Sequence, residues 1–136
     1  MSILVDFSQI ILSNLFANLH YLDTEINEDL LRHMTLNSLR HYRSKFRHKF
    51  GDLVLCVDDK QYWRRDVFPN YKAGRRKERE TSKYDWHLIF ESLNKIKNEI
   101  ATFLPYRVLD VPRAEADDLI GVICKFYHTS EPFLIL

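Results

Sequence analysis

The stretch Leu53-Val54-Leu55-Cys56-Val57-Asp58 decides the fold class of this chain. It opens with an unbroken apolar run and ends on a carboxylate. A strand with one solvated face alternates apolar and polar residues, whereas a strand buried on both faces reads as a continuous apolar run. Residues 53–57 are therefore predicted to form a strand of a parallel sheet that helices cover on both faces.

Three further apolar runs predict more strands of the same sheet, over residues 2–6, 106–109 and 133–136. Apolar residues at helical spacing between the runs predict helices over 9–20, 28–50, 84–104 and 114–128. Strands that alternate with helices indicate an α/β domain with a mainly parallel central sheet flanked by helices. The length of 136 residues suits one such domain.

Details of the helices follow from the same spacing. Ser8 is expected to cap the first helix and Gly51 to end the second. Phe90, Phe103 and Phe126 fall on the predicted inward stripes of the last two helices. We expect all three rings to be buried.

Acidic residues follow three of the predicted strands. Asp6 and Asp58 come directly after the first two, and the run Glu115-Ala116-Asp117-Asp118 comes one turn after the third. Parallel strands deliver their ends to one edge of the sheet, where carboxylates would repel each other unless a cation lies between them. Oxygen ligands of this kind suit Mg²⁺. Plain strand-ending or helix-capping roles are the alternative for each acid, and for Asp118 a capping or indirect role is an open interpretation.

The formal net charge of +1 hides a strongly basic middle of the chain. Residues 60–83 contain nine Lys or Arg against three acidic residues, a local charge of +6, which leaves −5 for the remainder. Residues 30–51 hold six Lys or Arg, three His and no acid. A basic block beside an acidic metal site is typical of proteins that act on a polyanion.

Residues 59–83, hereafter the basic segment, break the helix and strand pattern. They combine high charge with isolated aromatic residues, and Pro69 interrupts them. We expect a mobile, substrate-facing connection with short helical pieces, partly disordered without nucleic acid. The rings of Trp63, Phe68 and Tyr71 either stack on bases or pack within the segment, and the sequence leaves both interpretations open.

An ordered set of motifs resembles the 5′-nuclease (flap endonuclease) family over essentially the whole chain. The likeness is greatest to its bacteriophage branch, the RNase H-type 5′-to-3′ exonucleases of T-even-type phages. The matching pieces are Val5-Asp6-Phe7-Ser8-Gln9-Ile10, Val54-Leu55-Cys56-Val57-Asp58, Tyr62-Trp63-Arg64-Arg65-Asp66, Tyr71-Lys72 followed by Arg75, and Glu115-Ala116-Asp117-Asp118.

The resemblance implies a PIN-like, Rossmann-like nuclease domain with two Mg²⁺ ions, or Mn²⁺ in their place. It implies that Lys72 and Arg75 lie near the scissile phosphate as catalytic cations. The implied metal ligands are Asp6, Asp58, Glu115, Asp117 and, directly or indirectly, Asp118. The charge and aromatic content of the basic segment add candidate nucleic-acid-binding residues, namely Arg64, Arg65, Tyr71, Arg76, Lys77, Arg79 and Lys83.

The family removes RNA primers and flaps during lagging-strand replication, so the implied partners are DNA with a 5′ flap, an RNA–DNA hybrid and replication proteins such as a single-stranded-DNA-binding protein. The implied location is the cytoplasm of a phage-infected host. Family members continue past the fourth strand to further aspartates and a helix-turn-helix module. We therefore expect residues 1–136 to be the N-terminal part of the domain, truncated after the fourth strand. The sequence leaves open whether this part is a fragment, is completed by a second polypeptide or is a degenerate remnant.

A non-catalytic nucleic-acid-binding or assembly subunit remains the alternative. The sequence gives no support for a membrane-spanning helix or for a zinc site built on cysteines. No run of about 18 apolar residues, the length needed to span a bilayer, is present. Cys56 and Cys124 do not have zinc-site spacing and are expected to be free buried thiols.

Overall fold

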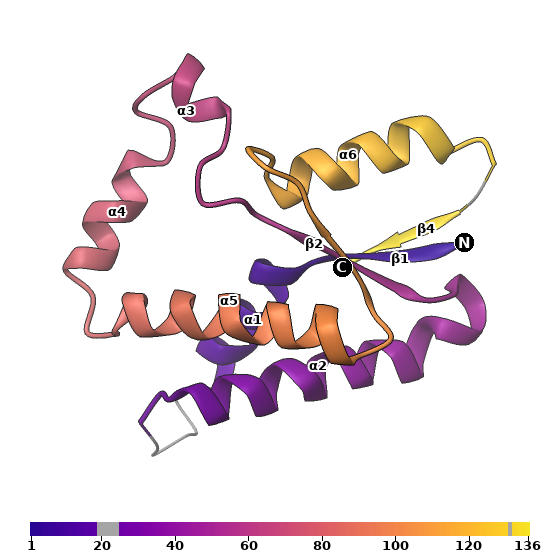
Figure 1. Ribbon diagram of the computed structural model, residues 1–136, viewed down its shortest axis with the longest axis horizontal. Helices are drawn as coiled ribbons and strands as arrows, with labels where there is room; N and C mark the ends of the chain where they lie inside the picture. The colour runs from indigo at the N-terminus through magenta and orange to yellow at the C-terminus, as the bar shows by residue number, and fades with distance from the viewer. Residues whose placement is uncertain (19–24, 131) are drawn as a thin grey trace.

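A computed structural model describes residues 1–18, 25–130 and 132–136. Its centre is a four-stranded, fully parallel sheet with the strand order β3-β2-β1-β4 (Figure 1). The strands are β1 (Ser2–Asp6), β2 (Leu53–Val57), β3 (Arg107–Asp110) and β4 (Phe133–Ile135). The predicted α/β fold with a parallel central sheet is confirmed.

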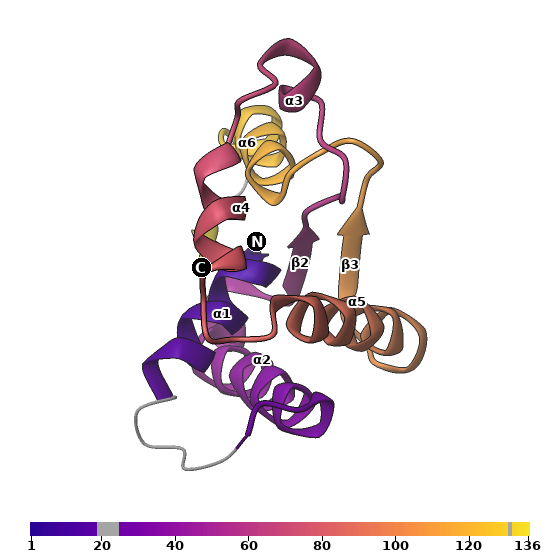
Figure 2. The same cartoon turned by 90° about the vertical axis from the view of Figure 1, so that its left-hand side faces the viewer.

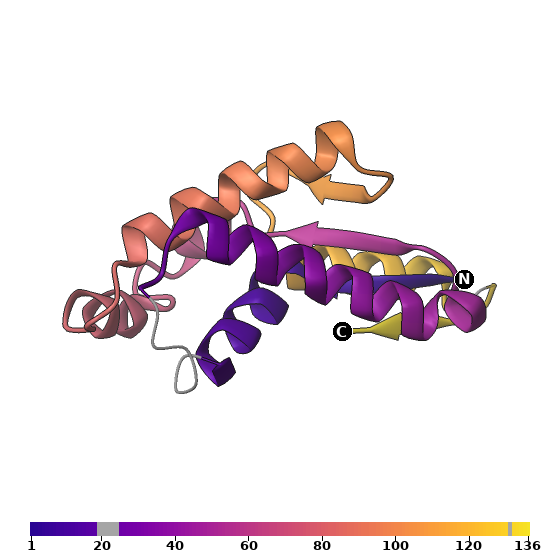
Figure 3. The ribbon, with the colours of Figure 1, turned by 90° about the horizontal axis from the view of Figure 1, so that it is seen from below.

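Helices cover both faces of this sheet. Figures 2 and 3 show α1, α2 and α5 on one face and α6 on the other. Two further helices, α3 and α4, lie outside these layers, between β2 and α5 in the chain (Figure 1). The six helices of the described ranges are α1 (Phe7–Asn18), α2 (Glu28–Phe50), α3 (Arg64–Val67), α4 (Ala73–Glu80), α5 (Trp86–Phe103) and α6 (Ala116–Tyr127).

The apolar strands β1 and β2 are buried on both sides, as predicted, whereas β4 was predicted to be buried and is only half-buried because it lies at the sheet edge. Ile3, Val5 and Leu55 belong to the core that the strands share with α1, α2 and α5. Leu4 and Cys56 point the other way and belong to a smaller core under α6. Each such side chain contributes about 1.5–3 kcal/mol through burial, so the two cores fix the positions of the strand ends.

The second helix begins and ends where the sequence predicted. Asn27 caps it by accepting a hydrogen bond from the Leu30 amide at 2.9 Å. Gly51 ends it with φ of 84°, and a Cβ there would lie 2.5 Å from the Met1 carbonyl oxygen. Only glycine fits this close approach without displacing the start of β1.

The first helix begins earlier than predicted. It starts at Phe7, directly after β1, and the Asp6 side chain accepts a hydrogen bond from the Gln9 amide at 2.9 Å. Asp6 therefore satisfies a helix-start amide, and the prediction that Ser8 caps the helix was wrong. The predicted end of this helix, at residues 19 and 20, lies outside the described residues.

Three aromatic rings predicted to be buried are exposed. The exposed fractions are 37% for Phe90, 78% for Phe103 and 71% for Phe126. The face of α5 that meets the core contains Leu93, Ile96 and Ile100, as predicted, and its first buried residue is Ile89 rather than Phe90. Phe103 and Phe126 lie in the last turns of their helices, beyond the residues that pack on the sheet.

The basic segment forms the short helical pieces that were predicted. It leaves the end of β2 on the α6 side and passes through α3 and α4 to reach the start of α5 on the opposite side (Figure 1). Neither α3 nor α4 contains a buried residue. None of the described helices combines the length and the apolar character that crossing a membrane requires.

Candidate active site

The ends of β1 and β2 bring acidic residues from distant parts of the sequence together. Asp6 ends β1 opposite Cys56, and Asp58 follows β2 directly. Burial raises the pKa of Asp6, and the nearby carboxylates of Asp58 and Asp117 raise it further. These three carboxylates thus interact at one end of the sheet. We call Asp6, Asp58, Glu115, Asp117 and Asp118 together the acidic edge.

Asp58 is oriented by the start of α6. Its Oδ1 accepts a hydrogen bond from the Ala116 amide at 2.8 Å, and Ala116 is the first residue of that helix. The contact satisfies a helix-start amide that has no partner within the helix. It also fixes Asp58 beside Asp117, the second residue of α6.

Glu115 is the buried member of the acidic edge. It is 3% exposed, and its two carboxylate oxygens form ion pairs with Arg64 Nη1 and Lys72 Nζ, each at 2.6 Å. A buried carboxylate is costly unless cations and hydrogen bonds offset its lost hydration. Burial lowers the pKa of Lys72, but the Glu115 carboxylate outweighs burial and the net shift is upward.

Asp118 joins the same ion-pair cluster from the first turn of α6. It accepts the Glu115 amide at 2.9 Å, and its Oδ1 lies 2.6 Å from Arg64 Nη2. Arg64 is the main reason that the pKa of Asp118 is lowered, and the Trp63 indole adds a hydrogen bond at 3.1 Å. The capping role left open by the sequence is therefore present in the structure.

Only part of the predicted cation set lies at the acidic edge. Arg64 and Lys72 are there, and Lys72 has the left-handed φ of 57° at the start of α4, an uncommon conformation for a residue with a side chain. Arg75 lies on the exposed surface of α4. No ion pair joins it to a carboxylate within the described part of the chain.

The remaining cations of the basic segment have other contacts. Arg76 pairs with Glu80 at 3.1 Å, and Arg65 donates to the Tyr62 hydroxyl at 2.9 Å. The Arg79 guanidinium lies over the rings of Trp86 and Phe90, and burial lowers its pKa. Lys83 lies over Tyr84, whereas Lys77 is exposed.

The sequence left open whether Trp63, Phe68 and Tyr71 stack on bases or pack within the basic segment. In the structure, Trp63 and Tyr71 pack within it. The Trp63 ring lies 4.7 Å from the Arg64 guanidinium carbon. Tyr71 contacts Tyr62 edge to face, with 5.8 Å between ring centroids. Phe68 is 58% exposed and remains free to contact a ligand.

A loop connection that the sequence did not reveal holds the basic segment to β3 and α6. The Asp59 side chain accepts the Arg113 amide at 2.6 Å, and the Trp63 amide donates to the Arg113 carbonyl at 2.9 Å. Arg113 also pairs with Asp66. In the sequence, the adjacent acids Asp58 and Asp59 suggest a shared site at the end of the strand. The structure shows instead that Asp59 binds the loop at Arg113, while Asp58 stays at the acidic edge.

The donor chemistry of the acidic edge suits a hard divalent cation, because carboxylate oxygens gather there. In the conformation described, however, no three His, Cys, Asp or Glu side chains of residues 1–18, 25–130 and 132–136 converge on one point suitable for an ion. Arg64 and Lys72 instead compensate the charge of Glu115 and Asp118.

Comparison with known proteins assigns this arrangement to a family. The family described as 5′-3′ exonuclease, N-terminal resolvase-like domain matches residues 1–136. The chain belongs to the 5′-3′ exonuclease family. It is also 42% identical over 126 residues to ribonuclease H of Enterobacteria phage T4, and the match covers 90% of this chain. The chain spans 41% of that relative's length.

Proposed function

We propose that this chain carries catalytic residues of a Mg²⁺-dependent 5′-to-3′ exonuclease and flap endonuclease. Its proposed substrates are phosphodiester bonds of RNA primers and of DNA 5′ ends during phage replication in the host cytoplasm. The observation that supports this most is the gathering of Asp6, Asp58 and Asp117 beside cations of the basic segment. Membership of the 5′-3′ exonuclease family supports the same class of reaction.

The proposed ligands of two Mg²⁺ ions, or of Mn²⁺, are Asp6, Asp58, Glu115 and Asp117. Bound metal would supply activation of a water molecule and stabilisation of charge on the phosphate oxygens. We propose that Arg64 and Lys72 release Glu115 when it binds metal, because each of its oxygens now forms an ion pair and these cations would repel a metal ion. Asp118 acts indirectly, since it holds Arg64 and caps α6.

The released cations have a proposed second role. Lys72, once freed from Glu115, can pair with a phosphate oxygen at the acidic edge, and Arg75 follows it by one helical turn on α4. Cations in this position stabilise charge that develops on a phosphoryl group. The exposed cations Arg76 and Lys77 would bind the flanking backbone without reading sequence.

The test is cleavage of a labelled 5′-flap DNA by the complete enzyme, in which this chain carries Asp58→Asn/Asp117→Asn. We expect cleavage to fall more than about 100-fold, the scale of losing a main electrostatic contribution, while DNA binding stays within about twofold. An asparagine at position 58 would still accept the Ala116 amide through its side-chain oxygen. Unchanged cleavage would refute the assignment.

A matched control and a second measurement sharpen this test. Asp29→Asn/Asp85→Asn removes two carboxylates away from the acidic edge, and an asparagine at position 85 can keep the cap on Leu88. This variant should cleave normally. In thermal unfolding, Mg²⁺ should raise the midpoint temperature of the wild type and of the control, but not that of the Asp58→Asn/Asp117→Asn variant.

A second candidate function is a non-catalytic nucleic-acid-binding or assembly subunit. The ion pairs that occupy Glu115 and Asp118 favour it, since both acids already have cationic partners. Cleavage assays with the chain alone, and then with any polypeptide encoded directly downstream, separate the two functions. Metal-dependent cleavage in either assay supports the nuclease, and binding without cleavage in both supports the subunit.

A second polypeptide is a proposed partner on structural grounds as well. β4 lies at an edge of the sheet, and Ile135 on it is 55% exposed. On the neighbouring α6, Val122 and Phe126 are also exposed, by 55% and 71%. An open strand edge beside exposed apolar side chains can accept an added strand or helix. Replication proteins, such as a single-stranded-DNA-binding protein, are further proposed partners. Purifying this chain from phage-infected cells that are replicating DNA, and identifying the proteins bound to it, tests them.

A further inference from the structure

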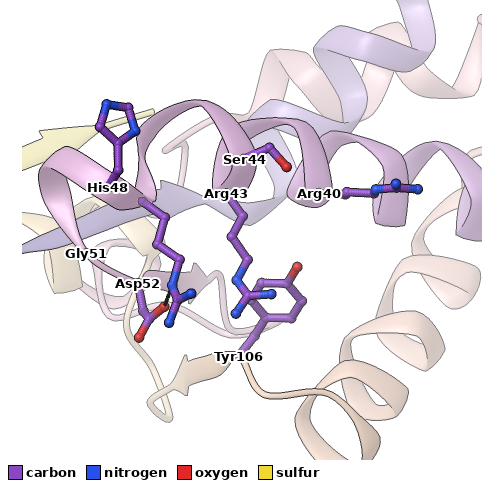
Figure 4. A pocket seen from close by; sticks show the side chains of 8 residues that line it. Arg40, Arg43, Ser44, His48, Gly51, Asp52 and Tyr106 are labelled. Carbon is purple, nitrogen blue, oxygen red and sulfur yellow. Dashed lines mark hydrogen bonds and ion pairs between the residues drawn. The ribbon is translucent and has the colours of Figure 1, made fainter.

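A second basic site lies at the end of the sheet opposite the acidic edge. It is a pocket of about 660 Å³, hereafter the arginine pocket, between the C-terminal half of α2 and the residues that precede β2 and β3 (Figure 4). Residues 52 and 58 flank β2, so at about 3.3 Å per residue the pocket lies roughly 20 Å from Asp58. The lining residues are Arg40, Arg43, Ser44, Arg47, His48, Gly51, Asp52 and Tyr106.

The sequence of α2 places three guanidinium groups along this pocket. Arg40, Arg43 and Arg47 are spaced by three and four residues and therefore share one helix face. At 1.5 Å per residue they span about 10 Å along the helix. The helix dipole favours cations only in the last turn, so it accounts for Arg47 but not for the other two.

Two of these arginines lack an anionic partner. Arg47 Nε bonds Asp52 Oδ1 at 2.7 Å. Across the part of the chain that the structure describes, neither Arg40 nor Arg43 has an ion pair or a side-chain hydrogen bond. Arg43 is nevertheless half-buried, and its side chain extends toward Tyr106 in Figure 4. A concave site with uncompensated cations attracts anions from solution.

We propose that the arginine pocket binds a phosphodiester segment of a nucleic acid strand. Guanidinium groups donate paired N–H bonds in a geometry that matches phosphate oxygens. The Ser44 hydroxyl and the Tyr106 ring lie in the same pocket and supply a further donor and a surface for a base or sugar. This contact goes beyond the proposed function, because it lies at the opposite end of the sheet and involves no residue of the acidic edge.

The lining favours a nucleic acid over an acidic protein segment. The eight described residues that line the pocket include no aliphatic side chain. Protein segments gain most of their affinity from a few apolar or aromatic anchors that become fully buried, and this pocket offers no such cavity. A phosphodiester backbone requires only cations and hydrogen-bond donors, which the pocket provides.

The experiment measures binding of a fluorescein-labelled 20-nucleotide oligothymidylate by fluorescence anisotropy, with a chelator present. The variant is Arg40→Gln/Arg43→Gln, and the matched control is Lys45→Gln/Lys49→Gln, which removes two cations of the same helix that do not line the pocket. We expect the first variant to bind about tenfold more weakly. Its slope of log affinity against log salt should fall by about 1.4, which is two phosphate contacts at about 0.7 each.

The control should lose less than about twofold in affinity and keep the salt slope of the wild type. Equal losses in both variants would overturn the proposal, since they would reflect net charge alone. So would unchanged binding by Arg40→Gln/Arg43→Gln. If that variant fails to fold, Ser44→Glu keeps both arginines, adds an opposing charge to the pocket and should weaken binding similarly.

Competition assays distinguish the sources of the anion. Unlabelled oligothymidylate should compete at far lower concentration than inorganic phosphate or thymidine monophosphate, and equal competition would overturn the proposal in favour of a small-anion site. Binding of polyglutamate that depends on Arg40 and Arg43, with oligonucleotide binding unaffected, would overturn it in favour of an acidic protein. All binding is measured with a chelator, so these results do not depend on whether the acidic edge binds Mg²⁺. For the same reason, Asp58→Asn/Asp117→Asn should bind the oligonucleotide like the wild type.

Discussion

The two regions that flank the acidic edge are stabilised by different forces. The layer formed by α1, α2 and α5 shares a continuous apolar core with the sheet, in which Leu15, Leu31 and Leu39 are fully buried. The α3 and α4 helices bury no residue and are held by ion pairs, ring contacts and loop hydrogen bonds. Burial thus fixes the carboxylates, whereas charge positions the cations. We therefore expect the cations to move if a metal ion or a phosphate changes the local charge.

The largest expected effect tests the apolar layer. Leu39→Ala should lower the free energy of unfolding by about 2–5 kcal/mol, because Leu39 is 0% exposed and the deletion leaves a cavity. Val67→Ala in α3 should change it by less than about 0.5 kcal/mol, because Val67 is 76% exposed. Denaturant unfolding of both variants measures the contrast, and comparable losses would contradict the difference between the two regions.

A smaller and more local effect is expected from Arg64→Gln. This change removes the ion pairs to Glu115 and Asp118, so the basic segment should open more often while the core remains folded. Hydrogen exchange in residues 59–83 should accelerate about tenfold, which corresponds to about 1.4 kcal/mol, and denaturant unfolding should change little. Arg65→Gln is the control, since Arg65 donates to the Tyr62 hydroxyl rather than to a carboxylate. Equal acceleration in both variants would argue against an electrostatic anchor.

The difference between the regions also explains how much the sequence predicted. Continuous apolar runs such as residues 53–57 specify buried strands, and a capped helix such as α2 has clear ends, so both were predicted within one residue. The meeting of Asp6 with Asp58 followed from the parallel order of the strands. These features depend on burial and on local spacing, which the sequence displays directly.

Features that depend on the three-dimensional path of a charged segment could not be predicted. Nothing in the local sequence distinguishes Arg64, which reaches Glu115, from Arg65, which does not. Arg79 resembles its neighbours in sequence but packs over Trp86. The error at Phe90 has a similar origin, because Ile89 and Phe90 are four and three residues before Leu93, so both suit helical spacing and only packing selects Ile89.

The repulsion at the acidic edge predicts that Asp6→Asn stabilises the metal-free protein. Burial and two carboxylates raise the pKa of Asp6, so its charged form costs stability at neutral pH. Asparagine removes the charge and can still accept the Gln9 amide. The expected gain is about 0.5–2 kcal/mol, the range for relieving an unfavourable charge, measured by thermal unfolding with a chelator. A loss of stability would contradict the inferred repulsion.

The smallest expected effect concerns a half-buried ion-pair network that joins α2 to α5. Arg32 pairs with Glu28 at 2.6 Å and with Glu99 at 2.8 Å, and Lys95 pairs with Glu28 at 2.8 Å. The ammonium group of Lys95, followed by Arg32, lowers the pKa of Glu28, and Arg32 lowers the pKa of Glu99. Both carboxyls normally titrate near 4.5.

A lowered pKa in the folded state means that the folded protein binds these protons less tightly than the unfolded chain does. The stabilisation is therefore present above about pH 4.5 and is lost as the pH falls through the lower, folded pKa values. Arg32→Gln should lower the midpoint of thermal unfolding slightly at pH 7, and its difference from the wild type should shrink below about pH 4. High salt should shrink the difference in the same direction, because solvent still reaches these half-buried pairs. A difference that persists at low pH would assign the effect to the packing of the Arg32 side chain between the two helices rather than to its charge.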